Sequence, residues 1–150
     1  MAQLGLDAEQ SYAQAARRVV AARTGELFAH LDGLLDIDRP ERVHKMRVAT
    51  RRLRAGLEVF AICFPRKQLA VVLDELKRLA AVLGERRDCD VQVALLSTLR
   101  ANAGRSERQA IDLLLDELHA EQLGANRRLA AAVEHATTAK LERRLRKLAQ

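Results

Sequence analysis

Apolar residues recur at steps of three and four along almost the whole chain, and few glycines or prolines interrupt them. The clearest run has apolar positions at Leu69, Val72, Leu73, Leu76, Leu79, Ala80 and Leu83. This spacing places them on one face of an α-helix, and no segment of useful length alternates with the period of two that a half-buried strand shows. With 7 Gly and 2 Pro among 150 residues, the chain is predicted to be all-α.

The pattern predicts an antiparallel bundle of five to six helices, with long first and fifth helices, because the linkers are short. Pro40 suits a first helical turn, and Asp38, Asp88 and Ser106 are predicted N-caps. Gly84 is predicted to lie just past the end of the third helix. The helices are expected at about 7–36, 40–63, 66–83, 88–101, 107–135 and 140–150.

Charge and composition limit the classes of partner. Lys+Arg number 26 against 20 Asp+Glu, and the sequence pI is about 10.0, which favours an anionic partner. Aromatic residues make up 3% of the chain, too few for the base stacking typical of single-stranded nucleic-acid binders. No apolar run approaches the ~18 residues of a membrane span, and the N-terminus lacks the pattern of a secretory signal. We expect a single cytoplasmic domain, residues 1–150, with no membrane association.

The potential metal ligands form no known pattern. Cys63 and Cys89 make no CxxC pair, and no two of the 4 His lie three or four residues apart. We therefore expect no metal site and no cofactor.

The most informative segment is Arg42–Arg54, which holds six Lys/Arg and one His without an acid. Within it, His44, Arg47, Arg51 and Arg54 are spaced three, four and three, which puts them within about 80° of one another on a helix. Like charges one turn apart destabilise a helix by about 0.2–0.5 kcal/mol per pair, so their concentration suggests a function that needs a dense positive field. Guanidinium groups one turn apart could each bind a separate phosphate of a linear polymer.

Several alternatives remain open for this ridge of four residues. It is also compatible with a solvated face, or with nonspecific nucleic-acid binding. His44 could be the phosphorylated residue of a histidine phosphotransfer bundle, although Arg47 and Val48 depart from the usual residues after that histidine. Further basic positions could join a binding surface or merely be solvated; they are Arg17, Arg18, Arg86, Arg87, Arg127, Arg128 and the basic C-terminus from Lys140 to Lys147.

Two motifs resemble the CHAD family, the conserved histidine α-helical domain. One is Val43-His44-Lys45-Met46-Arg47-Val48-Ala49-Thr50-Arg51-Arg52-Leu53-Arg54, and the other is Leu76-Lys77-Arg78-Leu79 followed by Leu83-Gly84-Glu85-Arg86-Arg87-Asp88-Cys89-Asp90-Val91. The resemblance spans about residues 39–96. It implies a helical fold that binds inorganic polyphosphate, association with polyphosphate granules, and a CYTH-type triphosphate-processing protein as a partner.

The matching motif positions imply a polyphosphate-binding role for His44, Arg47, Arg51, Arg54, Lys77 and Arg87. The resemblance implies no catalysis, and no carboxylate cluster that would hold magnesium is evident, so we expect a binding protein with no catalytic residues. Members of the family usually have two similar halves, and no second copy of the motifs follows Leu96. The chain is therefore expected to correspond to an N-terminal half: a truncated domain, a fragment, or a half that pairs with itself as a homodimer.

Overall fold

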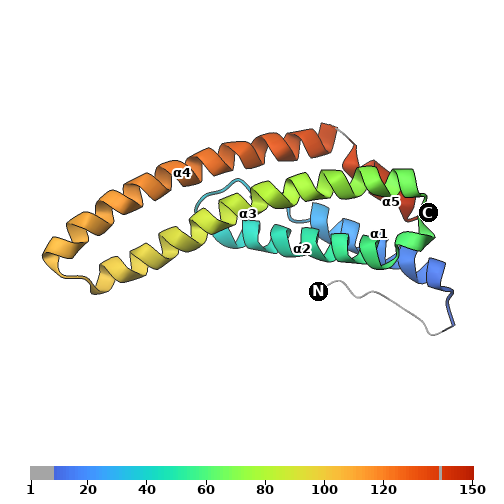
Figure 1. Cartoon of the computed structure of the whole chain (residues 1–150), viewed down its shortest axis with the longest axis horizontal. Coiled ribbons are helices and arrows are strands. Elements are labelled where there is room, and N and C mark those ends of the chain that lie inside the picture. The colour runs from blue at the N-terminus through green and yellow to red at the C-terminus, as the bar shows by residue number, and fades with distance from the viewer. Residues whose placement is uncertain (1–8, 139) are drawn as a thin grey trace.

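The computed structural model describes residues 9–138 and 140–150. Within them the chain forms α-helices and one short 3-10 helix, and no strand, which confirms the predicted all-α class. The elements are α1 (Tyr12–Phe28), α2 (Pro40–Val59), the 3-10 helix η1 (Ala61–Cys63), α3 (Arg66–Asn102), α4 (Arg105–Thr138) and α5 (Leu141–Leu148). Figure 1 shows α3 and α4 as two long antiparallel helices, with α1, α2 and α5 gathered around one end of the pair.

Local sequence explains where the helices begin. Ser11 caps α1 in a capping box with Gln14, and Pro40 occupies the first turn of α2. Phe64 and Pro65 are extended between η1 and α3, since a residue before proline is pushed out of the α region. Lys140 adopts a left-handed conformation, φ 61°, immediately before α5.

The core lies between α1, α2, α3, α5 and the second half of α4, which contributes Leu129. Its fully buried side chains include Leu27, Leu53, Leu76, Leu141 and Leu145. The start of α1 is held against the end of α2, because the Tyr12 hydroxyl donates to the Val59 carbonyl at 3.0 Å. The Tyr12 ring also packs on Phe60 with ring centroids 4.9 Å apart. These contacts fix α1 and α2 as antiparallel neighbours.

The structure corrects the predicted third and fourth helices. They are one continuous helix, α3, so Gly84 is not a helix end and Asp88 is not an N-cap. Glycine has a weak helix propensity, but α3 continues through Gly84 because the buried face of the helix continues on both sides of it, at Leu83, Arg86 and Asp90.

The first helix is shorter than predicted, ending at Phe28 rather than near residue 36. Residues 29–39 form turns, in which Gly33 adopts φ +66° and buried Leu34 anchors the segment in the core. Asp38 is not the N-cap of α2, since Arg39 holds that position without a side-chain hydrogen bond. Ser106 lies inside α4, which begins at Arg105. The long helices are therefore α3 and α4.

Candidate functional site

Three of the four ridge residues on α2 are exposed. His44, Arg47 and Arg51 are exposed, and Arg54 is half-buried beside Glu58, with the Arg54 Nη2 and Glu58 Oε1 atoms 3.7 Å apart. Among the described residues, no carboxylate lies within ion-pairing distance of His44, Arg47 or Arg51. These three side chains are thus available to an external anion.

The opposite side of α2 is held against α1 by a different arginine. Arg52 Nη1 donates to Glu26 Oε1 at 3.0 Å, and Arg23 Nη1 donates to Glu26 Oε2 at 2.6 Å. Burial alone raises the pKa of Glu26, but the hydrogen bonds and charges of Arg23 and Arg52 outweigh it, so that pKa lies below its ordinary value. Arg52 therefore has a structural partner, whereas the ridge faces away from α1.

Lys77 and Arg87 come from α3, the antiparallel neighbour of α2 (Figure 1). Both helices rise about 1.5 Å per residue from the connection that joins them, so Lys77 stands level with the part of α2 between Arg47 and Arg51. Lys77 is exposed, and Arg87, one turn after buried Leu83, is half-buried near the level where α2 begins. The six predicted positions thus come from two adjacent helices.

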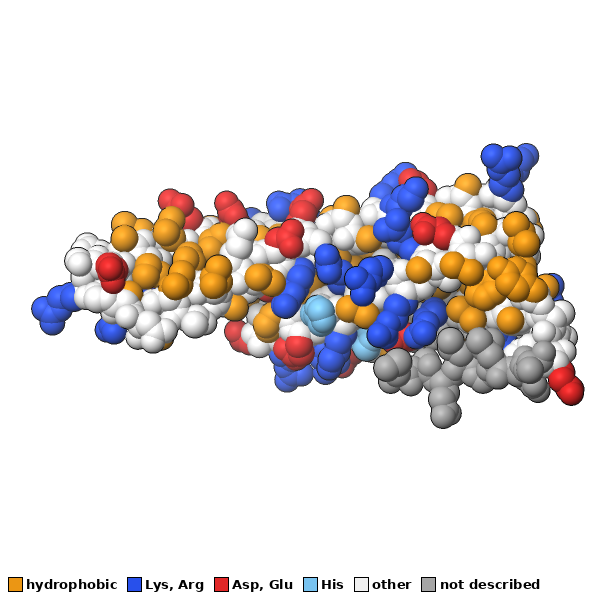
Figure 2. All heavy atoms as spheres, turned by 60° about the horizontal axis from the view of Figure 1, so that its bottom comes forward, with side chains coloured by type: hydrophobic (Ala, Val, Ile, Leu, Met, Phe, Trp, Pro, Cys, Tyr) orange, Lys and Arg blue, Asp and Glu red, His pale blue; other side chains and the backbone are white. Residues whose placement is uncertain are grey.

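Figure 2 shows Lys and Arg side chains gathered around histidine near the middle of the molecule. This is the part of the α3–α4 pair that α1 and α2 cover (Figure 1). Such a concentration of cations provides a positive field for a polyanion. Histidine would add a hydrogen-bond donor whose protonated form a bound phosphate favours.

Several of the other predicted basic positions are paired with carboxylates. Arg128 Nε donates to Glu85 Oε2 at 2.9 Å, Arg144 is paired with Glu75, and Arg146 is paired with Glu142. Arg17, Arg18 and Arg127 are exposed. The paired arginines connect helices or turns, and this use competes with anion binding.

Sequence analysis missed the role of Arg86. It was predicted to lie at a helix start and favour anions, but its side chain is fully buried in the middle of α3 and paired with Asp90. Burial lowers the pKa of Arg86. The i,i+4 spacing of Arg86 and Asp90 is the sequence signal that would have identified this pair.

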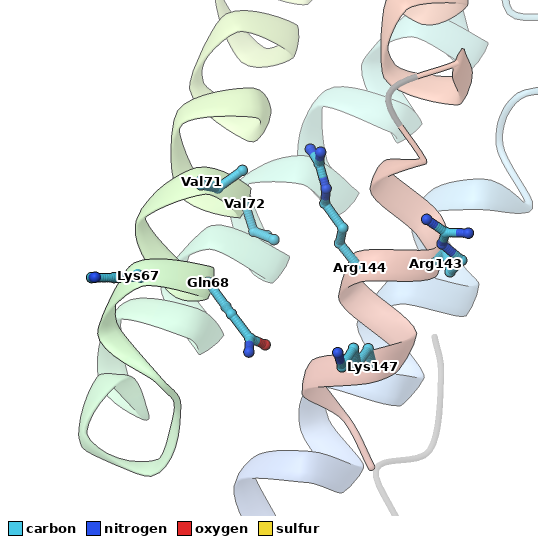
Figure 3. A pocket seen from close by; sticks show the side chains of 7 residues that line it. All are labelled: Lys67, Gln68, Val71, Val72, Arg143, Arg144 and Lys147. Atoms are coloured by element: carbon cyan, nitrogen blue, oxygen red, sulfur yellow. The ribbon is translucent and has the colours of Figure 1, made fainter.

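A cavity of about 580 Å³ lies elsewhere, between the first turns of α3 and α5. It is lined by Lys67, Gln68, Val71, Val72, Arg143, Arg144 and Lys147. Figure 3 shows that Lys67 and Arg143 point away from the space between the helices, while Gln68 points into it. Lys67 and Arg143 therefore do not converge on one ligand position.

Two kinds of feature are absent from the described part of the chain. No group of three His, Cys, Asp or Glu side chains could hold a metal ion there. Residues 9–138 and 140–150 also contain no helix with the length and hydrophobicity to span a membrane.

Comparison with known proteins places these features in a family. Two Mycobacterium tuberculosis proteins, uncharacterized protein MT2285 of strain CDC 1551 / Oshkosh and uncharacterized protein Rv2226 of strain H37Rv, are each 38% identical to this chain over 82 residues. The match covers 55% of this chain and 16% of either relative, so the chain corresponds to a small part of these longer proteins. No solved structure matches significantly. The CHAD domain family matches residues 18–150, which extends well beyond the two motifs, and the chain therefore belongs to the CHAD domain family.

Proposed function

We propose that this chain binds inorganic polyphosphate through the basic surface formed by the ridge of α2 and by Lys77 and Arg87 of α3. CHAD domains are associated with polyphosphate binding in general. The observation that carries the proposal for this chain is the exposed, acid-free row His44, Arg47 and Arg51, which lies level with Lys77.

The chemistry of the row suits a linear phosphate polymer. Charge-assisted hydrogen bonds from guanidinium to phosphate are strong, and the forked donors of arginine match two phosphate oxygens. Arg47 and Arg51 lie one turn apart, about 6 Å along the helix axis, so they can engage separate phosphates of one chain. A polymer with one charge per repeat is thus favoured over a single small anion.

The proposed activity is binding without turnover, and the proposed place of action is the cytoplasm, including polyphosphate granules. A CYTH-type triphosphate-processing protein is the proposed functional partner. Incubation with polyphosphate, magnesium and nucleotides is expected to leave the polymer length unchanged on gels. Shortening or elongation of the polymer would contradict this proposal.

A matched pair of substitutions on α2 tests the site. Arg47→Glu should weaken polyphosphate binding by at least about tenfold, since it replaces an attraction by a repulsion. Lys45→Glu makes the same change of charge on an exposed residue that projects from another side of the helix, and should have a much smaller effect. Calorimetry with polyphosphate of defined length measures both, and equal losses would show that only net charge matters.

Competition distinguishes polyphosphate from nucleic acid. Long-chain polyphosphate should displace labelled duplex DNA at a far lower phosphate concentration than DNA needs to displace labelled polyphosphate. Equal competition would favour a general nucleic-acid binder. An acid-labile phosphate on His44 would instead favour the phosphotransfer alternative.

A further inference from the structure

The cavity between α3 and α5 is separate from the surface proposed for polyphosphate. None of its seven lining residues belongs to the six positions assigned to that polymer. Its volume of about 580 Å³ lies within the range of about 300–1,000 Å³ that is typical of pockets for small organic ligands. The kind of ligand that it suits follows from the side chains that line it.

Part of the lining of this cavity is apolar. Val71 is 46% exposed, and Val72, the next residue along α3, is buried in the core. Val71 is the one exposed apolar side chain in the lining, since every other exposed residue there is polar or charged. An aliphatic group packed against Val71 would remove apolar area from water on both sides of the contact. The two valines therefore favour a ligand with a hydrocarbon part.

The rest of the lining is basic and contains no acid. It consists of Gln68 and four cations: Lys67, Arg143, Arg144 and Lys147. Arg144 is paired across the helices with Glu75 of α3, whose side chain is 10% exposed. Among the described residues, no carboxylate lies within ion-pairing distance of Lys147. The cavity thus has a net positive field and an ammonium group available to a ligand.

Gln68 and Lys147 come from the two helices that face each other across the cavity. Figure 3 shows Gln68 pointing into the space from α3, with Lys147 opposite it on α5. An ammonium group and a side-chain amide both supply hydrogen-bond donors for an anion. Lys67 and Arg143, which point away, contribute to the positive field without contacting the same ligand atoms.

We propose that this cavity binds a single-chain amphiphilic anion, that is, a phosphate or carboxylate group attached to an aliphatic chain. The anionic group accepts hydrogen bonds from Lys147 and Gln68, and the chain packs against Val71 and Val72. A bare inorganic anion would leave Val71 exposed to water, and a neutral lipid would leave Lys147 without a counter-charge. This ligand differs from a linear polyanion, so the site is independent of the proposed polyphosphate surface.

The first test is calorimetry with hexyl, octyl and decyl phosphate, each below its critical micelle concentration. Affinity should rise by up to about fourfold for each methylene that becomes buried. Inorganic phosphate should bind at least about tenfold more weakly than decyl phosphate. An affinity that does not depend on chain length would overturn the proposal, and so would decanol binding as tightly as decyl phosphate.

Two substitutions with matched controls locate the ligand. Val71→Gln should weaken decyl phosphate binding by at least about fivefold. Its control is Val91→Gln, since Val91 lies on the same helix and is 47% exposed, but does not line the cavity. Circular dichroism should show the same helix content in both proteins. An equal loss in both variants would contradict the apolar contact.

The charged contact is tested in the same way. Lys147→Glu should weaken decyl phosphate binding by at least about tenfold, because it replaces an attraction by a repulsion. Lys45→Glu makes the same change of charge at an exposed position on α2, outside the cavity, and should have little effect. Equal losses would show that the ligand responds only to net charge and would overturn the site.

A last comparison separates this site from the ridge and from a membrane surface. Arg47→Glu, which should impair polyphosphate binding, should leave the affinity for decyl phosphate unchanged. Loss of decyl phosphate binding in this variant would place the ligand on the ridge and overturn the proposal. Binding to phosphatidylglycerol vesicles without binding of monomeric decyl phosphate would also overturn it, because a bilayer would then be the partner.

Discussion

Arg86 and Asp90 form an ion pair one turn apart on α3, with both side chains fully shielded from solvent. The pair also joins the two long helices, since Gln122 Nε2 of α4 donates to Asp90 Oδ1 at 2.8 Å. Removing two charges from water costs several kcal/mol, and their attraction offsets this cost only when the geometry is good. The pair lies at the point where α3 extends beyond the core, since Arg86 and Asp90 are the last buried residues along this helix.

Breaking the pair should be more damaging than removing it. Asp90→Ala leaves the Arg86 guanidinium buried without its carboxylate, and should lower the free energy of unfolding by about 3–5 kcal/mol. The double variant Arg86→Met/Asp90→Leu should be more stable than Asp90→Ala, because no charge stays buried. Asp88→Ala, at an exposed position two residues away, is the control and should change stability by at most about 0.5 kcal/mol. Urea unfolding measures all three, and an unchanged Asp90→Ala variant would refute the prediction.

Acid should weaken the contact between α1 and α2 through Glu26. The pKa of Glu26 is lower in the folded chain than in the unfolded one, because Arg23 and Arg52 outweigh its burial. A lowered carboxyl pKa contributes stability above the unfolded value of about 4.3, and this contribution is lost as the pH falls through the folded value. Glu26→Gln should thus lower Tm at pH 7 and have less effect in stronger acid. The exposed Asp32→Asn variant should retain the native profile, and a Glu26→Gln effect independent of pH would argue against the mechanism.

Salt should report how many ridge residues contact phosphate. Binding of a polyanion releases counterions, so the logarithm of affinity should fall steeply and linearly with the logarithm of salt concentration. Removing one phosphate contact in Arg51→Gln should reduce that slope by about one. Lys45→Gln should leave the slope nearly unchanged. Identical slopes for Arg51→Gln and the unaltered chain would exclude Arg51 from the contact.

Neighbouring basic residues of α3 should differ in their effect on binding. Lys77 is exposed at the level of the ridge, whereas Arg78 Nη2 donates to Asp74 Oδ2 at 2.5 Å. Lys77→Gln should weaken polyphosphate binding by about three- to tenfold, and Arg78→Gln by less than about twofold. Fluorescence titration with end-labelled polyphosphate measures both. The opposite order would remove Lys77 from the proposed surface.

Helical class and the helices around the ridge could be predicted from the sequence, because local spacing determines them. The same spacing that placed Met46, Ala49 and Leu53 on one face also left His44, Arg47 and Arg51 outside it, and the structure buries the first set and exposes the second. Pro40 fixed the start of α2 in the same local way.

The errors arose where tertiary contacts outweigh local preference. Gly84 looks like a helix end by propensity, but the buried face formed by Leu83 and Arg86 continues through it. The burial of Arg86 was not predicted because a run of charged residues normally indicates a solvated turn. The contact that Gln122 makes with Asp90, 32 residues away, is visible only in the folded chain.

The acidic segment 109–126 of α4 also polarises the molecule. It carries four negative charges without a cation, so the rest of the chain carries a net charge of +10 against +6 overall. The centres of positive and negative charge are therefore displaced along the long axis, which gives the molecule a permanent electric dipole. The field of a polyanion exerts a torque on this dipole, which turns the helices around α2 toward the polymer and the far end of the α3–α4 pair away from it. Orientation before contact thus follows from the four acids of residues 109–126.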